Sequence, residues 1–214
     1  EPNDRESYSV VAANRPITIQ DLLTHTAGIS YGSGPAAREW EEAEITGWYF
    51  ANRSESVREV MNRLAKLPFD AHPGEQWVYG YNTDILGVLI EQISGQTLAD
   101  FLNERLFQPL QLHDSHFFLP QEKVERLATV YSSTDDGSVD RAPDPGHKAA
   151  IPDYGYGCVE CANQGSYING PRKSFSGGAG LLSTATDYAT FLQMLLNGGD
   201  LQGKRILTRK TVEL

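Results

Sequence analysis

The chain has 214 residues, of which 40% are hydrophobic and 21% are charged. This is the composition of a globular chain that can bury a core, and it argues against extensive disorder. Eighteen basic and 28 acidic residues give a formal net charge of −10, which repels phosphate backbones and argues against a nucleic-acid partner. No apolar stretch approaches the ~20 residues of a transmembrane helix, so no membrane insertion is expected.

Two capping boxes predict the first helices. Thr18-Ile-Gln-Asp21 starts a short helix that ends at Ala27-Gly28, and Ser56-Val-Arg-Glu59 starts a second helix that Pro68 closes. In each box the hydroxyl accepts a hydrogen bond from a free backbone amide, and the acid accepts one in return. Residues 30–37 between the two helices have the composition of a loop.

The central part of the chain predicts two more helices. Trp77-Val78-Tyr79 is expected to be a short extended run after a turn at residues 72–75. From Asn82 apolar residues recur at helical spacing up to Ser94-Gly95, and a further helix starts at Thr97 and runs to Pro109. About two residues join these helices, so we expect them to pack against each other.

The last third begins with a long loop. Residues 131–173 are rich in Gly, Pro, Asp and Ser, and we expect one loop with a short hairpin near Tyr131. A glycine-rich extended stretch follows from Ser174, and Thr184-Ala-Thr-Asp187 is a capping box for a helix that ends at Asn197. Both ends look cut, so we expect an interior piece of a longer protein.

Five segments share a pattern with one enzyme superfamily. They are Ile17-Thr-Ile-Gln-Asp-Leu-Leu-Thr-His-Thr-Ala-Gly28, Pro73-Gly-Glu-Gln-Trp-Val-Tyr-Gly-Tyr-Asn-Thr-Asp-Ile-Leu-Gly87, Leu106-Phe-Gln-Pro-Leu-Gln-Leu112, Gly177-Gly-Ala-Gly-Leu181 with Ser183-Thr184, and Met194-Leu-Leu-Asn-Gly-Gly199. In this order they resemble the serine β-lactamase-related superfamily, and within it the class C branch that includes esterases built on the β-lactamase fold.

The resemblance implies an α+β fold of the serine β-lactamase/transpeptidase type. Relatives combine an α/β lobe with a mostly helical lobe, and the active site lies between them. For residues 1–214 it implies a partial domain: a helical lobe at 17–130, the long loop at 131–173, and a glycine-rich strand with helices at 174–214. We therefore expect many helices, few strands, and an exposed face of apolar residues through which the chain self-associates.

The resemblance also implies three active-site elements: a Ser-x-x-Lys helix start, a Tyr-x-Asn-type loop, and a Lys-Thr-Gly-like strand. None of the 214 residues forms a Ser-x-x-Lys motif. Lys210-Thr211-Val212 lacks the glycine and lies in a helical pattern, so we interpret it as coincidence. Only the middle element is present, as Tyr79-Gly80-Tyr81-Asn82.

Tyr79 is the candidate catalytic base by its position in this element. A phenol near its reference pKa of ~10 is a poor base at neutral pH, so nearby cations must lower that pKa. The structural alternative is a tyrosine that packs beside Trp77. In the complete protein the resemblance implies that Tyr79 acts on a serine hydroxyl.

The element departs from the family pattern, because Tyr81 stands where Tyr-x-Asn places the amide and Asn82 comes one residue late. This makes β-lactam turnover doubtful and favours the esterase-type members. Tyr81 is a second active-site phenol, a wall of the acyl pocket, or a core residue. With Asn82, Gly177 and Gly178 it forms the predicted substrate-binding set; the glycines either permit close backbone approach or serve packing.

Other residues have weaker claims. His25 is expected to bond loop carbonyls and fix a turn near the site. Arg172 and Lys173 either meet an anionic group of a substrate or form a solvated basic pair. Cys158 and Cys161 are spaced C-x-x-C in a loop, which fits unreactive thiols or a local disulfide better than half of a metal site or a redox pair. No metal or cofactor is implied.

The function that we predict is hydrolysis of a small-molecule ester or amide through a seryl acyl-enzyme, by a complete protein of which this chain is an inactive part. The alternatives are a β-lactamase or D-Ala-D-Ala peptidase, and a non-catalytic binding module on the same fold. Relatives are often exported, but the chain carries no signal segment, so its compartment stays open.

Overall fold

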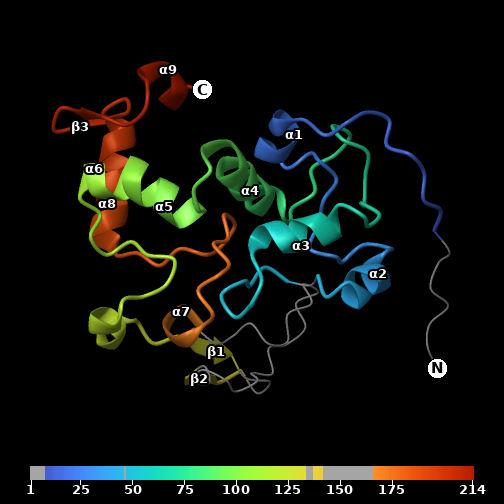
Figure 1. Ribbon diagram of the computed structural model, residues 1–214, viewed down its shortest axis with the longest axis horizontal. Coiled ribbons are helices and arrows are strands. Elements are labelled where there is room, and N and C mark those ends of the chain that lie inside the picture. Colours follow the sequence, from blue (N-terminus) through green and yellow to red (C-terminus); the bar gives the residue numbers. More distant parts are fainter. Residues whose placement is uncertain (1–7, 46, 134–136, 142–165) are drawn as a thin grey trace.

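The computed structural model of the chain describes residues 8–45, 47–133, 137–141 and 166–214 (Figure 1). Helices dominate this part, and its strands form two small two-stranded sheets. In Figure 1 the helices labelled α1 to α4 lie on one side of the molecule, and α5, α6, α8 and α9 lie on the other. The expectation of many helices and few strands is confirmed.

The first two capping boxes form as predicted. Helix α1 (Ile19–Leu23) begins after Thr18, and helix α3 (Val57–Leu64) begins after Ser56. In both, the hydroxyl of the capping residue accepts a hydrogen bond from the amide of the acid, and the acid side chain accepts one from the amide of the capping residue. Between them lies helix α2 (Ala37–Glu42), whose start has no side-chain cap. Without a cap, the sequence held no signal for where this helix begins.

The two central helices also follow the prediction. Helix α4 (Asn82–Ser94) ends at Gly95, which adopts a left-handed φ of 71°. Helix α5 (Leu98–Leu102) then continues through a π-helical turn (Asn103–Phe107) into helix α6 (Gln108–Leu110). The short connection packs α5 against α4, as expected from its length.

The region predicted as a long loop contains three regular elements. A 3₁₀ helix (Gln121–Arg126) precedes it, and strand β1 (Tyr131–Ser133) pairs antiparallel with strand β2 (Val139–Arg141). This confirms the hairpin near Tyr131. Helix α7 (Ser166–Asn169) was not predicted. Cys158 and Cys161 lie outside the described residues.

The glycine-rich stretch is a turn, which corrects the expected strand. Residues 177–179 turn beside α4, where the Oγ of Ser176 accepts hydrogen bonds from the amides of Gly178 and Ala179 at 3.2 and 3.1 Å. A single antiparallel bridge then joins Leu182 to His116. The serine hydroxyl satisfies backbone amides that a strand would have paired with a neighbour.

Helix α8 (Ala185–Leu196) begins at Thr184, but its capping box is incomplete. The Thr184 hydroxyl accepts a hydrogen bond from the amide of Asp187. The Asp187 carboxylate instead accepts from the amide of Asp114 at 2.8 Å and from Ser115 Oγ at 2.9 Å. The predicted acid therefore connects α8 to the segment that follows α6.

The chain ends in a small hairpin and a short helix. Strands β3 (Asp200–Leu201) and β4 (Lys204–Arg205) pair antiparallel, and helix α9 (Arg209–Val212) follows. Lys210-Thr211-Val212 lies in this helix, as its sequence pattern predicted.

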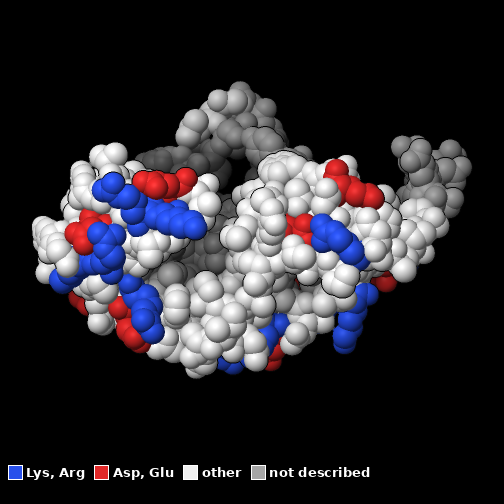
Figure 2. All heavy atoms as spheres, turned by 90° about the horizontal axis from the view of Figure 1, so that it is seen from above, with Lys and Arg blue, Asp and Glu red and all other residues white. Residues whose placement is uncertain are grey.

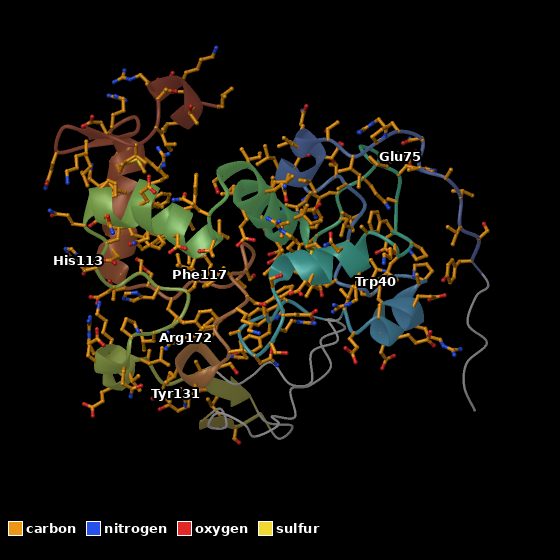
Figure 3. All side chains as sticks on the ribbon, viewed as in Figure 1. Trp40, Glu75, His113, Phe117, Tyr131 and Arg172 are labelled. Atoms are coloured by element: carbon orange, nitrogen blue, oxygen red, sulfur yellow. The ribbon has the colours of Figure 1, made fainter. Side chains whose placement is uncertain are left out.

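Three clusters of buried apolar side chains stabilise the fold. The first lies among α1 to α4 and includes Trp40 and Tyr81; the second includes Phe117 and Tyr167; the third packs α8 onto the α5–α6 segment around Met194. Figure 3 labels Trp40 and Phe117, which lie in different parts of the molecule. The burial of these side chains is the main favourable contribution to folding.

Large apolar side chains are exposed outside these clusters. On α8 the residues Tyr188, Leu192 and Leu196 follow one another at four-residue spacing and are 59%, 45% and 81% exposed. Ile93 on α4 is 79% exposed. Self-association through such residues stays a prediction.

On the face in Figure 2, acidic and basic side chains lie near one another toward both ends, with much uncharged surface between them. Among the described residues no helix is long and apolar enough to span a bilayer.

Candidate functional site

Tyr79 lies on an irregular segment directly before α4. The predicted extended run of residues 77–79 pairs with no strand; it is held by the amide of Val78, which donates to the carbonyl of His25 at 2.7 Å. The Tyr79 side chain is 53% exposed. A group from outside this part of the chain can therefore reach its ring, which the catalytic hypothesis requires.

Aromatic rings hold Tyr79 on several sides. His25 and Trp77 both stack on it, with centroid distances of 5.0 and 5.7 Å and interplanar angles of 30° and 22°. Tyr31 meets it edge-to-face at 5.7 Å. We call His25, Tyr31, Trp77 and Tyr79 the Tyr79 cluster. Stacked and edge-to-face contacts of this kind each stabilise a pair of rings by about 0.5–1.5 kcal/mol, so they favour this position of the Tyr79 ring.

The two tyrosines of this cluster differ in exposure. Tyr31 is 8% exposed, and burial, together with the negative charge of Asp84 and the neighbouring Tyr79, raises its pKa. Tyr31 is therefore a neutral phenol at physiological pH. Tyr79 is the phenol of the cluster that a substrate or a serine hydroxyl can approach.

Tyr81 is a core residue, which corrects its assignment to the substrate-binding set. Its side chain is fully buried, and its hydroxyl donates to the carbonyl of Gly47 at 2.6 Å. The ring packs against Tyr31, Trp40 and Phe50. Burial raises the pKa of the Tyr81 hydroxyl, so it acts as a neutral donor inside the first apolar cluster.

Asn82 is also buried, and its amide serves the backbone rather than a ligand. Its Nδ2 atom lies 3.3 Å from the carbonyls of Ile29 and Val78 and 3.1 Å from Nδ1 of His25. The side chain therefore ties the segment after α1 to the segment that carries Tyr79. This corrects the expectation that Asn82 contacts a substrate.

Gly177 and Gly178 pack tightly against α4. A Cβ atom on Gly177 would lie 2.4 Å from the carbonyl oxygen of Thr83, and one on Gly178 would lie 2.7 Å from Oδ2 of Asp84. This supports the packing alternative for both glycines. Both are also exposed to solvent, so contact with a substrate stays a prediction.

Asp84 is a buried acid that the sequence analysis missed. It is 1% exposed, and its Oδ1 accepts from Ser176 Oγ at 2.6 Å and from the amide of Gly178 at 3.2 Å. Burial raises the pKa of Asp84 to about 6, although the bonds from Ser176 and Gly178 oppose this rise. The sequence offered one signal for the burial of this acid, which is its position directly before the apolar residues Ile85 and Leu86 in a predicted helix.

His25 and Arg172 both fix loop backbone. His25 has a left-handed φ of 55°, and its own carbonyl accepts the bond from Val78, so its backbone fixes the turn. In the described contacts its imidazole meets Nδ2 of Asn82 at 3.1 Å rather than a loop carbonyl, which corrects the expected bond. Arg172 donates to the carbonyls of Leu119 and Ile168 at 2.8 and 3.1 Å and is labelled in Figure 3. Arg172 and Lys173 are both exposed, which fits a solvated basic pair, and Arg172 also ties loop backbone; contact of either with an anionic group of a substrate stays a prediction.

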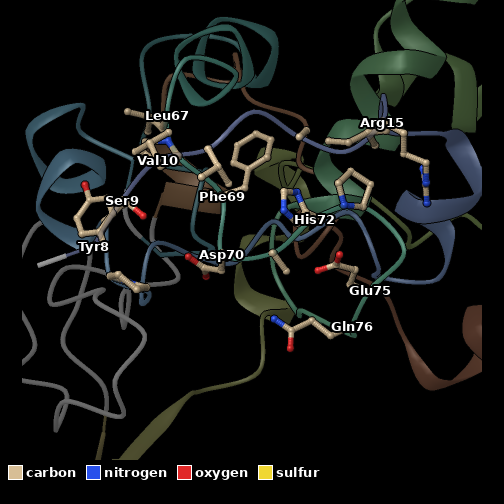
Figure 4. Close-up of a pocket in the computed structure, with 18 of the residues that line it drawn as sticks. Tyr8, Ser9, Val10, Arg15, Leu67, Phe69, Asp70, His72, Glu75 and Gln76 are labelled. Carbon is tan, nitrogen blue, oxygen red and sulfur yellow. The ribbon is translucent and has the colours of Figure 1, made fainter. Parts of the chain in front are cut away.

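A cavity of about 840 Å³ is lined by none of the four residues of the Tyr79 cluster (Figure 4). It is lined by residues of segments 8–17 and 67–76, among them Val10, Phe69, His72 and Glu75, together with Pro35 and Ala36. Tyr79 does not line it. In the described ranges no three His, Cys, Asp or Glu side chains come together as a metal site.

Comparison with known proteins identifies relatives. A family model described as "Beta-lactamase" matches residues 9–214. The chain is 30% identical to a lovastatin esterase of Penicillium rubens over 85% of its own length and 40% of that protein. It is also 30% identical to the esterase EstB of Burkholderia gladioli, over 84% of its own length and 44% of EstB.

The chain is also similar to a solved structure. The structure of EstCE1, described as a hydrolase with promiscuous acyltransferase activity, superposes with a TM-score of 0.76 at 27% identity. The match covers 94% of this chain and 50% of EstCE1. The chain thus spans half or less of the length of the relatives named here.

Proposed function

The chain belongs to the beta-lactamase family, and we propose that it contributes the catalytic base, Tyr79, to an enzyme that cleaves small-molecule esters or amides through a seryl acyl-enzyme. The observation that carries this proposal is the exposed phenol of Tyr79, held by stacked rings at the start of α4. Two relatives of the chain are described as esterases, and one similar solved structure is described as a hydrolase with promiscuous acyltransferase activity.

The proposed chemistry has two steps. Tyr79 accepts the proton of a serine hydroxyl while the serine oxygen attacks the carbonyl carbon, and it passes this proton to the alcohol or amine that leaves. Water then attacks the acyl-enzyme and gives a proton to Tyr79, which returns it to the serine oxygen as the acid is released. A phenol is a poor base at neutral pH unless cations stabilise the phenolate, so the proposal requires cations from the remainder of the active site beside Tyr79. The serine and its lysine come from chain outside these 214 residues, so this chain alone is inactive.

Two features of the Tyr79 segment favour an ester over a β-lactam as substrate. The position two residues after Tyr79 holds the buried phenol of Tyr81, where the family's Tyr-x-Asn pattern places an amide. The amide of Asn82 is engaged with His25 and two backbone carbonyls. Neither Tyr81 nor Asn82 is therefore free to hold the amide side chain of a β-lactam. Esterases among the relatives support the same choice.

A fluorophosphonate probe, which labels activated serines, tests the proposal in the full-length gene product. We expect Tyr79→Phe to slow labelling at least about 100-fold, the lower range of a general-base contribution. Tyr188→Phe is the matched control, because Tyr188 is also an exposed tyrosine but lies on α8. Equal labelling of wild type and Tyr79→Phe would remove Tyr79 from this role.

A further inference from the structure

The imidazole of His25 touches both Tyr79 and Asn82. Its ring stacks on the phenol ring at a centroid distance of 5.0 Å, and its Nδ1 lies 3.1 Å from Nδ2 of Asn82. Its own carbonyl accepts the amide of Val78. His25 is therefore connected to the Tyr79 segment through a ring contact, a side-chain contact and a backbone hydrogen bond.

The orientation of the Asn82 amide follows from its backbone neighbours. The carbonyls of Ile29 and Val78, which can only accept, both lie 3.3 Å from Nδ2. Rotating the amide by 180° would place its oxygen against these two oxygens. Among the described residues the Oδ1 atom has no hydrogen-bond partner, so the buried amide depends on the contacts of its nitrogen.

This orientation decides which nitrogen of His25 carries the proton. Nδ1 faces an NH₂ group, so it can only accept, and the ring proton must lie on Nε2. We infer that Asn82 holds His25 as the neutral Nε2–H tautomer and that His25, in this state, is a positioning residue for Tyr79. The positioning role rests on the function proposed for Tyr79, whereas the tautomer does not.

Nitrogen NMR of the chain labelled with ¹⁵N-histidine tests the tautomer directly. The His25 signals are those that disappear in His25→Gln and remain in His72→Gln, whose Nδ1 faces the amide of Asn14 at 3.3 Å. We expect an unprotonated Nδ1 and a protonated Nε2 for His25 at neutral pH. A protonated Nδ1 would overturn the inference, whatever the activity of the enzyme.

Kinetics of the full-length gene product test the positioning role. His25→Phe keeps a ring but removes the acceptor for Asn82, and His25→Gln keeps an acceptor but removes the ring. We expect roughly tenfold lower kcat with little change of KM in both, as a displaced base predicts. Unchanged kcat in both variants would refute positioning, whereas an inactive wild type would refute the proposed function instead.

Discussion

Asp84 Oδ1 accepts a 2.6 Å hydrogen bond from the hydroxyl of Ser176, 92 residues later in the chain. The same oxygen accepts the amide of Gly178. The buried carboxyl group of Asp84 therefore holds the turn of residues 177–179 against the first turn of α4. Asp84 lies five residues after Tyr79. This contact links the glycine-rich turn to the candidate base.

Asp84 should make stability depend on pH in a particular direction. Its pKa in the folded protein is raised to about 6 from an ordinary value of 3.8, so folding favours the protonated form. Its contribution is therefore fully present below pH 3.8 and is lost as pH rises through 6, by about 3 kcal/mol at most. Asp84→Asn keeps an acceptor for Ser176 and removes the titration.

Urea unfolding at pH 4 and pH 7 measures this effect. The free energy of unfolding of Asp84→Asn minus that of wild type should be larger at pH 7 than at pH 4. Glu122→Gln, on the exposed 3₁₀ helix, should show no such change. An equal difference at both pH values would mean that Asp84 does not titrate in this range.

A substitution at Gly178 should destabilise the chain through Asp84. In Gly178→Ala the added Cβ would lie 2.7 Å from Asp84 Oδ2, an overpacked contact that costs about 1–3 kcal/mol. In an Asp84→Ala background the same change should cost much less, because the opposing oxygen is gone. A double-mutant cycle by urea unfolding measures the coupling; additive effects would contradict the direct contact.

The start of α8 allows two contributions to be compared. Thr184→Ala removes one cap hydrogen bond and should cost about 1 kcal/mol. Asp187→Ala should cost more, because it removes the acceptor of Asp114 and Ser115 in a buried position. Thermal unfolding of the two variants gives the order, and an equal loss would show that the bonds to Asp114 and Ser115 contribute little.

The exposed side of α8 should cause self-association of this chain. We expect sedimentation velocity to show concentration-dependent association that Leu192→Glu and Leu196→Glu weaken, because both side chains are exposed and a buried carboxylate is costly. Gln193→Glu introduces the same charge at an exposed polar position of the same helix. A monomer at all concentrations, or an equal effect of Gln193→Glu, would refute this prediction.

Substrate preference tests the inference that Tyr81 and Asn82 do not contact a β-lactam. With both side chains buried, the full-length protein should hydrolyse p-nitrophenyl butyrate far faster than nitrocefin. Comparable kcat/KM values for the two compounds would show that an amide from elsewhere replaces the one missing after Tyr79. Boiled protein is the control for both assays.

Local signals in the sequence determined where α1 and α3 start and where α4 ends. They did not determine where α1 and α3 end, because these helices stop at Leu23 and Leu64, before the predicted stops at Ala27-Gly28 and Pro68. Thr18 and Ser56 cap helices through hydrogen bonds to residues only three positions away. Gly95 ends α4 because glycine adopts a left-handed backbone conformation at little cost in free energy. The order of motifs was also enough to predict the family and to select Tyr79 as the candidate base. These signals act over one or two helical turns, so they can be interpreted without the fold.

Only the tertiary structure decided the roles of Tyr81, Asn82 and Asp84. Whether a phenol lines a pocket or packs in a core depends on what surrounds it, and for Tyr81 these neighbours are Trp40, Phe50 and the carbonyl of Gly47. The glycine-rich turn likewise depends on Asp84, far away in sequence. Burial and long-range hydrogen bonds are properties of the packed chain, and no pattern of adjacent residues encodes them.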